Sequence, residues 1–330
     1  RFVNRTREIG QIEEDVRAGY KLIILHGLLG IGKSSLAEKA MLWLYPNRAS
    51  NIITLDFNSI SGMAELSIEL SRRTKTAMLN DNCGDQDQKT NIQYFFEVIT
   101  ASNYLLILKN VKGWLNEDGT LSDNLQFVTD LVVKTEIFNS VVIMTSSRFV
   151  ELPNDYFEQT SQFPLKGMDD AHISDIIKYN LPTTFEVDTR KNLEFAKCLQ
   201  GYPLAAKLSA YRINNHGYDY YLQQLNKIQS LKIGLAKEFI DYAGLSTLCQ
   251  KYLKIQSLSK SRLRSEEYES AFPELKNRVA ALADEAFFSG ILSFDEDGCY
   301  KLETIVEDYF YDLAFNSQSE KKFVNSWNRV

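Results

Sequence analysis

The sequence lacks the features of membrane-spanning, secreted and metal-binding proteins. It has no run of 18 or more apolar residues, and its N-terminus shows no signal-peptide pattern. Its four cysteines lie far apart without a C-x-x-C pair, which argues against a disulfide framework and a zinc site. Its three histidines show no ligand spacing with one another or with the cysteines. We therefore expect a cytoplasmic protein that does not span a membrane.

An excess of positive charge is also missing. The chain has 37 Lys and Arg against 43 Asp and Glu, which gives a net charge of −6. This balance argues against nucleic acid as a partner of the surface as a whole. A length of 330 residues predicts about two or three domains. The 44% of hydrophobic residues and 24% of charged residues are typical of globular proteins with a sizeable core.

The most specific pattern is G-x-x-x-x-G-K-[ST], which residues 27–34 match as GLLGIGKS. The apolar run at 21–26 is typical of a strand, and residues 34–45 have apolar side chains at helical spacing. Between a strand and a helix, this spacing predicts a phosphate-binding loop. Its backbone N–H groups and Lys33 would bind phosphate oxygens, and the Ser34 hydroxyl would ligate Mg²⁺. The expected binding residues are Gly27, Gly30, Ile31, Gly32, Lys33, Ser34 and Ser35.

Further strands alternate with helical segments up to about residue 167. Apolar runs predict strands at 51–57, 104–108, 141–144 and 162–165. Helices are predicted at 63–76, 91–100 and 122–136, with an exposed polar loop at 80–89. Continuous apolar strands separated by helices indicate a parallel sheet covered on both faces. The expected fold class is an α/β P-loop NTPase domain over residues 1–167.

Beyond residue 168 the sequence predicts mainly helices. Helical spacing at 169–179, 189–199, 205–213 and 220–228 indicates a helical domain over residues 168–240. Residues 241–330 are expected to form helices near 246–257, 266–271 and 275–289, a hairpin turning at 295–298, and a helix from 304. Three helices followed by a hairpin are typical of a winged-helix domain.

Taken in order, these motifs resemble the core of the STAND NTPases, which include the NB-ARC group of apoptosome and plant resistance proteins and similar bacterial antiviral ATPases. Residues 2–9, FVNRTREI, look like the family's F-V-G-R-x-x-E-L segment, with Asn4 in place of glycine. In the family this segment lies beside the adenine. The resemblance therefore implies that Val3 and Arg5 contact the base and ribose.

Two later motifs also resemble the family. Residues 142–148 look like the strand that ends in T-[TS]-R, whose arginine senses the γ-phosphate, which implies that role for Arg148. Residues 201–205, GYPLA, match the G-x-P-L-A motif, whose proline packs against adenine, which implies that contact for Pro203. Taken alone, this motif also fits a helix that begins with proline.

One departure from the family lies at the metal strand. The family pattern is h-h-h-h-D-[DN]-V, where h is a hydrophobic residue, whereas residues 105–111 read LLILKNV. Lys109 replaces the aspartate that holds the Mg²⁺ shell, and an ammonium would repel the metal. Lys109 could instead neutralise phosphate or turn to solvent. Asn110 cannot take a proton, so we expect slow or absent hydrolysis, unless another residue such as Asp56 supplies a carboxylate.

A second departure lies in residues 302–310, LETIVEDYF, where the family often has a histidine at the second position. In relatives this histidine contacts the β-phosphate of ADP. Glu303 replaces it here, and a carboxylate beside a phosphate is unfavourable. We therefore expect that Glu303 does not read the nucleotide and that ADP and ATP are poorly discriminated.

The resemblance implies a molecular switch. Bound ATP or ADP, or dATP in place of ATP, with Mg²⁺, would bias a closed autoinhibited form against an oligomerising signalling form in immunity, antiviral defence or cell death. The implied partners are further copies of the chain and effector and sensor domains outside this sequence. We therefore expect the sequence to be the core of a longer protein.

Two alternatives remain open. One is an AAA+ DNA-binding ATPase of the origin-recognition or loader type, and the other is a hydrolysis-dead scaffold that keeps its nucleotide. Residues 241–330 hold 11 Lys and Arg against 15 Asp and Glu, and the candidate recognition helix 274–289 is not basic. DNA binding depends on phosphate neutralisation, so these charges argue against the first alternative. Single-turnover hydrolysis would separate the scaffold from a working switch.

Overall fold

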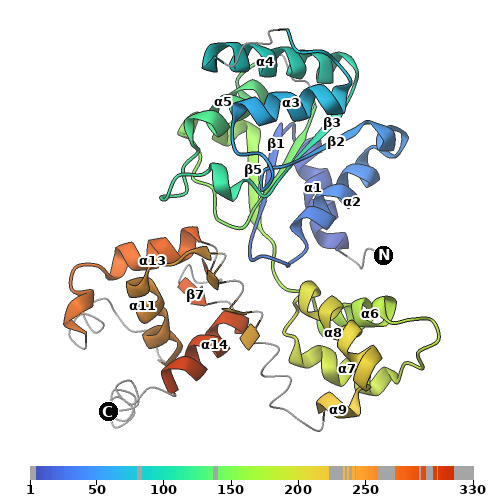
Figure 1. Cartoon of the computed structure of the whole chain (residues 1–330), viewed down its shortest axis with the longest axis vertical. Helices are drawn as coiled ribbons and strands as arrows, with labels where there is room; N and C mark the ends of the chain where they lie inside the picture. The colour runs from blue at the N-terminus through green and yellow to red at the C-terminus, as the bar shows by residue number, and fades with distance from the viewer. Residues whose placement is uncertain are drawn as a thin grey trace. The chain divides into compact units, whose positions relative to one another are not determined.

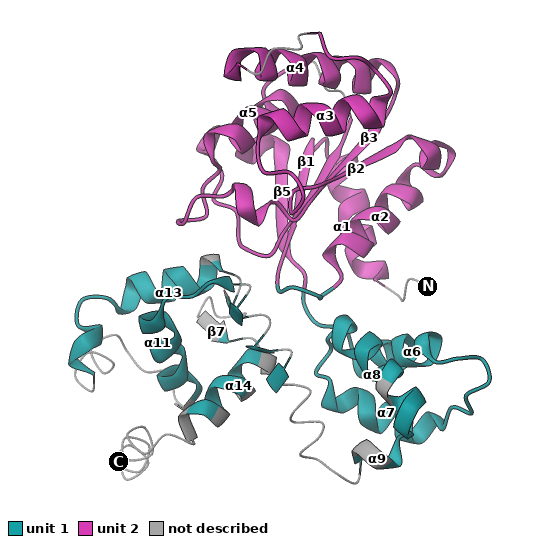
Figure 2. Ribbon diagram, in the orientation of Figure 1, with its two compact units in different colours: residues 1, 28–31, 166–330 teal, residues 2–27, 32–165 magenta. Residues whose placement is uncertain are grey.

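The computed structural model describes residues 5–79, 84–136, 140–222, 233–234, 236–237, 240–241, 243–258, 272–289, 291–294, 300–302 and 304–315. The chain divides into two compact units (Figure 2). Unit 2 consists of residues 2–27 and 32–165. Unit 1 consists of residues 1, 28–31 and 166–330, so it includes the middle of the predicted phosphate loop.

Unit 2 is built on a five-stranded parallel sheet with the strand order β2-β3-β4-β1-β5 (Figure 1). The strands are β1 (Leu22–His26), β2 (Ile52–Asp56), β3 (Leu105–Lys109), β4 (Val142–Ser146) and β5 (Thr160–Pro164). Leu22 and Ile24 of β1 belong to one hydrophobic core, and Ile23 and Leu25, which point to the opposite face, are equally buried. Burial on both faces explains why these strands are continuous apolar runs in the sequence.

Helices cover this sheet. They are α1 (Thr6–Arg17), α2 (Lys33–Leu44), α3 (Met63–Thr74), α4 (Asp85–Ala101) and α5 (Asp123–Val133). Helix α1 packs against α2, and α3 packs against α4 (Figure 1). Side chains of α3, α4 and α5 share the core that contains Leu22 and Ile24. Short 3-10 helices η1 (Pro46–Asn51), η2 (Val111–Trp114) and η3 (Asn154–Gln159) complete the described elements of unit 2. The predicted parallel sheet with helices is confirmed.

All five predicted strands are present with ends within two residues of the prediction, but the predicted loop at 80–89 is wrong from residue 85 onward. Helix α4 begins at Asp85, and its first inward-facing side chains are the buried amides Gln88 and Asn91. Because these side chains are polar, the sequence has no apolar periodicity at the start of this helix. Acidic residues in its first turn interact favourably with the helix dipole. Helix α1 was not expected from the sequence either.

The first part of unit 1 is helical. It contains α6 (Asp170–Asn180), α7 (Thr189–Cys198), α8 (Pro203–His216) and α9 (Asp219–Leu222), and α6 packs against both α7 and α8. Asp169 and Asp188 cap the first two helices, because their Oδ1 atoms accept backbone hydrogen bonds at 2.9 and 3.0 Å. The helices predicted up to residue 216 are therefore present. The predicted helix at 220–228 lies mostly outside the described residues, and the helical domain over 168–240 stays a prediction.

The rest of unit 1 contains α11 (Thr247–Leu258), η4 (Pro273–Leu275), α13 (Val279–Phe288), β6 (Leu292–Phe294), β7 (Tyr300–Leu302) and α14 (Thr304–Phe315). Helix α11 packs against α13 and α14, and the two strands are antiparallel. The helix predicted at 275–289 begins only at Val279, because Asn277 has a φ of +57° that interrupts a helix. The predicted helix at 266–271 and turn at 295–298 lie outside the described residues. The winged-helix domain over 241–330 therefore stays a prediction, as does the boundary at residue 167.

None of the helices described in either unit is long enough and apolar enough to cross a membrane.

Candidate phosphate-binding site

The predicted phosphate loop joins the end of β1 to the start of α2. Gly27, Gly30 and Gly32 have φ angles of +138°, +78° and +104°, a range in which residues with a Cβ are strained. A Cβ on Gly27 would also lie 2.8 Å from the backbone oxygen of Leu165. The loop conformation therefore favours glycine at residues 27 and 32, the two positions at which the motif requires it.

Lys33 is the first residue of α2 and is buried, with 6% of its surface exposed. Its Nζ donates a hydrogen bond to Gly27 O at 2.6 Å, so the ammonium lies back over the loop. Burial lowers the pKa of Lys33 to about 7. Burial, and then the charge of Lys33, lower the pKa of the preceding strand residue His26 to about 4. His26 is therefore neutral at pH 7, whereas Lys33 is partly protonated at that pH and is the group of the loop that can carry a positive charge.

The remaining loop residues surround the start of α2. Ile31 is buried, Ser34 is half-buried and Ser35 is exposed. Helix α2 has no acidic residue in its first turn. The positive end of its dipole is therefore not neutralised locally, which favours an anion at this position.

Parallel strands bring their carboxyl ends to one edge of the sheet. Strand β4 pairs with β1 and with β3, so that His26 lies opposite Ser146 and Leu108 lies opposite Met144. The start of the phosphate loop and the residues that follow β3 and β4 therefore leave the sheet at the same edge. Ligands of open α/β sheets bind at this edge.

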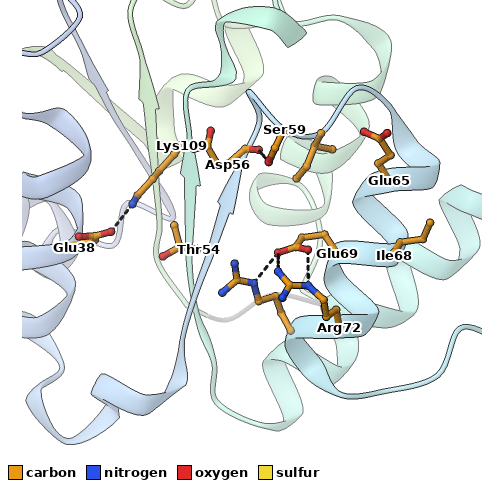
Figure 3. A pocket seen from close by; sticks show the side chains of 11 residues that line it. Glu38, Thr54, Asp56, Ser59, Glu65, Ile68, Glu69, Arg72 and Lys109 are labelled. Atoms are coloured by element: carbon orange, nitrogen blue, oxygen red, sulfur yellow. Dashed lines mark hydrogen bonds and ion pairs between the residues drawn. The ribbon is translucent and has the colours of Figure 1, made fainter.

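Lys109 ends β3, and its ammonium forms an ion pair with the carboxylate of Glu38 in α2 (Figure 3). The contact can form because α2 packs on β3. The Lys109 side chain is only 17% exposed. The expectation that Lys109 turns to solvent is therefore wrong, because the carboxylate of Glu38 holds it against α2. Direct neutralisation of phosphate by Lys109 stays a prediction.

Asp56 is the last residue of β2 and lies directly opposite Lys109. Its carboxylate is hydrogen-bonded to nearby residues. Its Oδ1 accepts hydrogen bonds from Asn110 Nδ2 at 3.0 Å and from Asn58 N at 3.1 Å. Strand β2 lies three strands away from β1, a lateral distance of roughly 14 Å at the usual spacing. This distance argues against Asp56 as a replacement acid beside the phosphate loop.

Arg148 follows β4, and its backbone N donates to Ser146 Oγ at 3.0 Å. Its Nη1 donates to Asn116 O at 3.4 Å. Burial, and then the charge of Arg148, lower the pKa of Lys112 to about 8. The basic side chains of Lys112, which follows β3, and Arg148, which follows β4, therefore lie near each other. Two positive charges close together favour the binding of an anion. The γ-phosphate role of Arg148 stays a prediction.

Arg5 directly precedes α1, and Val3 lies outside the described residues. Arg5 is buried, with an exposed fraction of 6%, and its Nη1 lies 2.6 Å from Glu8 Oε1. The first turn of α1 therefore holds the guanidinium in place. The ion pair with Glu8 does not test the ribose contact that the resemblance implies for Arg5, and this contact stays a prediction.

Within unit 1, the start of α8 lies beside the middle of the phosphate loop. Pro203 is the first residue of α8, and Leu204 N donates to Gly30 O at 3.2 Å. A Cβ on Gly30 would lie 2.6 Å from the Cβ of Leu204. The turn before α8 is equally tight, since Gly201 has a φ of +82° and a Cβ there would lie 2.5 Å from Met168 O. Within unit 1 the G-x-P-L-A motif therefore contacts Gly30 through Leu204. The adenine contact that the resemblance implies for Pro203 stays a prediction.

A groove of about 540 Å³ lies beside the Glu38–Lys109 pair (Figure 3). It is lined by Glu38, Thr54, Asp56, Ser59, Ile60, Glu65, Ile68, Glu69, Arg72, Arg73 and Lys109. Glu69 accepts hydrogen bonds from Arg72 Nε at 2.9 Å and from Arg73 Nε at 2.7 Å. None of residues 27–35 lines this groove, so it is distinct from the phosphate loop.

The residues present do not fit a Mg²⁺ ion held by the metal strand. Ser34 supplies a hydroxyl, but an ammonium stands at the position of the carboxylate. Among the residues that the structure describes, no group of three or more His, Cys, Asp or Glu could hold a metal ion. Mg²⁺ prefers carboxylate and phosphate oxygens. These residues therefore provide no basis for a metal-assisted reaction.

Sequence reasoning missed Glu38 and Leu204. Glu38 lies four residues after Ser34, and residues at this spacing share one face of a helix. That spacing, together with an unexpected lysine at the metal strand, could have predicted an ion pair. Nothing in the sequence near Leu204 predicts its contact with Gly30, because the two segments are far apart in the chain.

No family model matches this sequence, and no curated protein matches it. Among solved structures, the chain is similar to the Walker-type ATPase PABY2304 of Pyrococcus abyssi, with a TM-score of 0.65 and 14% identity over 94% of this chain and 96% of that one. It is also similar to the ORC2 protein of Aeropyrum pernix in its ADPNP–ADP complexes, with a TM-score of 0.58 and 11% identity over 96% of both chains.

A STAND protein with a tetratricopeptide repeat sensor, PH0952 of Pyrococcus horikoshii, matches with a TM-score of 0.40 and 17% identity over 98% of this chain and 44% of that one. This score is too low to carry an argument. At these identities the comparisons establish the fold alone: the chain has the fold of P-loop ATPases.

Proposed function

We propose that this chain binds ATP or ADP at its phosphate loop and acts as a nucleotide-controlled switch of the STAND class with slow hydrolysis. The observation that carries the proposal is a glycine-dependent loop that leads to the buried Lys33 at the start of α2, together with a lysine at the end of β3, on which α2 packs. The loop supports nucleotide binding, because glycines, a helix N-terminus and a lysine are the groups that recognise phosphate in loops of this kind. The missing acid supports slow turnover.

The proposal assigns the other predicted residues to the same ligand. Lys33 and the backbone of the loop bind the β- and γ-phosphates, and Arg148 contacts the γ-phosphate. The ribose and base are contacted by Val3, Arg5 and Pro203. The proposed ligand is dATP as well as ATP. The nucleotide present then sets the balance between a closed form and a form that associates with further copies of the chain.

Purified protein is expected to carry nucleotide in near-equal amount to the protein, because a closed form slows its release. Acid denaturation followed by ion-exchange chromatography identifies the released molecule. ADP indicates a closed switch, and ATP indicates a form with little hydrolysis. Protein that carries no nucleotide and also fails to bind ATP in a titration would contradict the proposal.

A second candidate function is an origin-recognition type of DNA-binding ATPase. The fold similarity to the ORC2 protein of Aeropyrum pernix supports it, with TM-scores of 0.58 and 0.59 in two nucleotide complexes. The net charge of −4 in residues 241–330 opposes it. Fluorescence anisotropy with duplex DNA at low salt separates the candidates. Binding that weakens steeply with added salt would favour the second candidate.

Nucleotide binding is expected to take up protons in mildly alkaline buffer. The pKa of Lys33 is lowered to about 7 by burial, so the side chain is mostly neutral at about pH 8.5 without ligand. A bound phosphate favours the charged form and raises this pKa, so binding at that pH should take up close to one proton. Calorimetry in buffers of different ionisation enthalpy measures the number. A Lys33→Arg variant, whose guanidinium does not titrate, should take up clearly fewer protons than the unmodified protein, and an equal uptake in both proteins would contradict the assignment.

A further inference from the structure

Lys109 has the opposite charge to the residue expected at the end of the metal strand, and the carboxylate of Glu38 pairs with it. The family pattern has a carboxylate where β3 ends, and this chain has a lysine whose side chain is 17% exposed. The ammonium is built into the structure, because the carboxylate of Glu38 on the neighbouring helix holds it. Figure 3 shows Lys109 extending from β3 to α2.

The ion pair lies one helical turn from the hydroxyl that would ligate a metal. Ser34 and Glu38 are four residues apart in α2, so their Cβ atoms are about 5–6 Å apart on the same face. Lys109 contacts Glu38 and therefore approaches this face of α2. Its ammonium has three N–H donors, and one of them points to Glu38 Oε1.

The charge of Lys109 equals the charge that a strand carboxylate and its metal ion would together provide. A carboxylate with one negative charge and Mg²⁺ with two positive charges together place one positive charge beside the phosphates. Lys109 by itself carries the same single positive charge at the end of β3, where the carboxylate of Glu38 pairs with it. A Mg²⁺ ion added beside Lys109 would meet a like charge, and β3 itself ends without a carboxylate.

We propose that Lys109 takes the place of the divalent cation, so that this chain binds its nucleotide without Mg²⁺. The proposal rests on the proposed nucleotide site. Glu38 acts as a positioning residue, because it keeps the long lysine side chain beside the start of α2. The carboxylate that contacts Lys109 is that of Glu38, whereas Asp56 Oδ1 accepts hydrogen bonds from Asn110 and Asn58.

The test compares the affinity for ATP in saturating Mg²⁺ and in excess EDTA, by calorimetry on nucleotide-stripped protein. We expect the two dissociation constants to agree within about threefold, well below the tenfold difference that corresponds to about 1.4 kcal/mol. In the Lys109→Asp variant we expect the affinity in EDTA to fall at least about tenfold and Mg²⁺ to restore it.

Further variants keep the test decisive if Lys109→Asp does not fold. Lys109→Met retains the length of the side chain without its charge, and it should lose affinity in EDTA and in Mg²⁺ alike. Glu38→Gln leaves the ammonium charged, so binding should remain independent of Mg²⁺. Lys39→Asp makes the same charge change at an exposed position of α2, and its affinity should not respond to Mg²⁺.

The outcomes separate this proposal from the proposed function. Unmodified protein that binds ATP more than about tenfold more tightly in Mg²⁺ than in EDTA would overturn the replacement of metal by Lys109 and leave the nucleotide site intact. Unmodified protein that binds no ATP under either condition would overturn both.

Discussion

Replacing Lys33 by alanine is expected to weaken ATP binding at least about tenfold, which corresponds to about 1.4 kcal/mol. The ammonium is already buried over the phosphate loop, where its Nζ lies 2.6 Å from Gly27 O. A hydrogen bond between charged groups contributes about 1.5–3 kcal/mol, and without Lys33 only backbone N–H groups and the α2 dipole would remain in the loop. Titration with a fluorescent ATP analogue measures the loss.

The exposed residue Lys39 provides the matched control for this variant. Lys39→Ala removes a lysine from the same helix without touching the loop, and its affinity should stay unchanged. Lys33→Ala itself should not lower the melting temperature, because burial opposes the charged form of Lys33 and lowers its pKa. A variant that melts normally and binds ATP as tightly as the unmodified protein would remove the phosphate-loop assignment.

The strands and the phosphate loop could be predicted because their signals are local. Burial of β1 requires a run of apolar residues, and the turn that follows it requires glycines at positive φ. Both signals lie in consecutive residues, so they can be recognised in the sequence. The start of α4 could not be predicted, because its inward face begins with the amides Gln88 and Asn91. Burial of these polar side chains is a property of tertiary packing.

The residues around the loop were predicted less completely. The sequence identified Lys109 as a departure from the family pattern, yet the partner of its ammonium depends on how α2 packs on β3. The contact between Leu204 and Gly30 likewise joins segments that are far apart in the chain. Both contacts follow from the tertiary fold, which periodicity and motif spacing do not describe.

Replacing Gly27 by alanine is expected to destabilise unit 2 by about 2–4 kcal/mol. Its φ of +138° lies where a residue with a Cβ is strained, and the new Cβ would lie 2.8 Å from Leu165 O. This carbonyl cannot easily move away, because Leu165 N donates to His26 O at 2.7 Å and fixes the chain after β5 beside β1. The variant should unfold at lower urea concentration and lose ATP affinity.

Gly10→Ala is the matched control, because the same substitution should have the opposite effect there. Gly10 lies inside α1, where no atom comes within 4 Å of an added Cβ. Alanine is favoured over glycine in a helix interior by about 0.5–1 kcal/mol, so this variant should unfold at slightly higher urea concentration. ATP affinity should not change, since α1 is separate from the phosphate loop in the chain. If the Gly27→Ala protein were as stable as the Gly10→Ala protein, the left-handed conformation assigned to the start of the loop would be wrong.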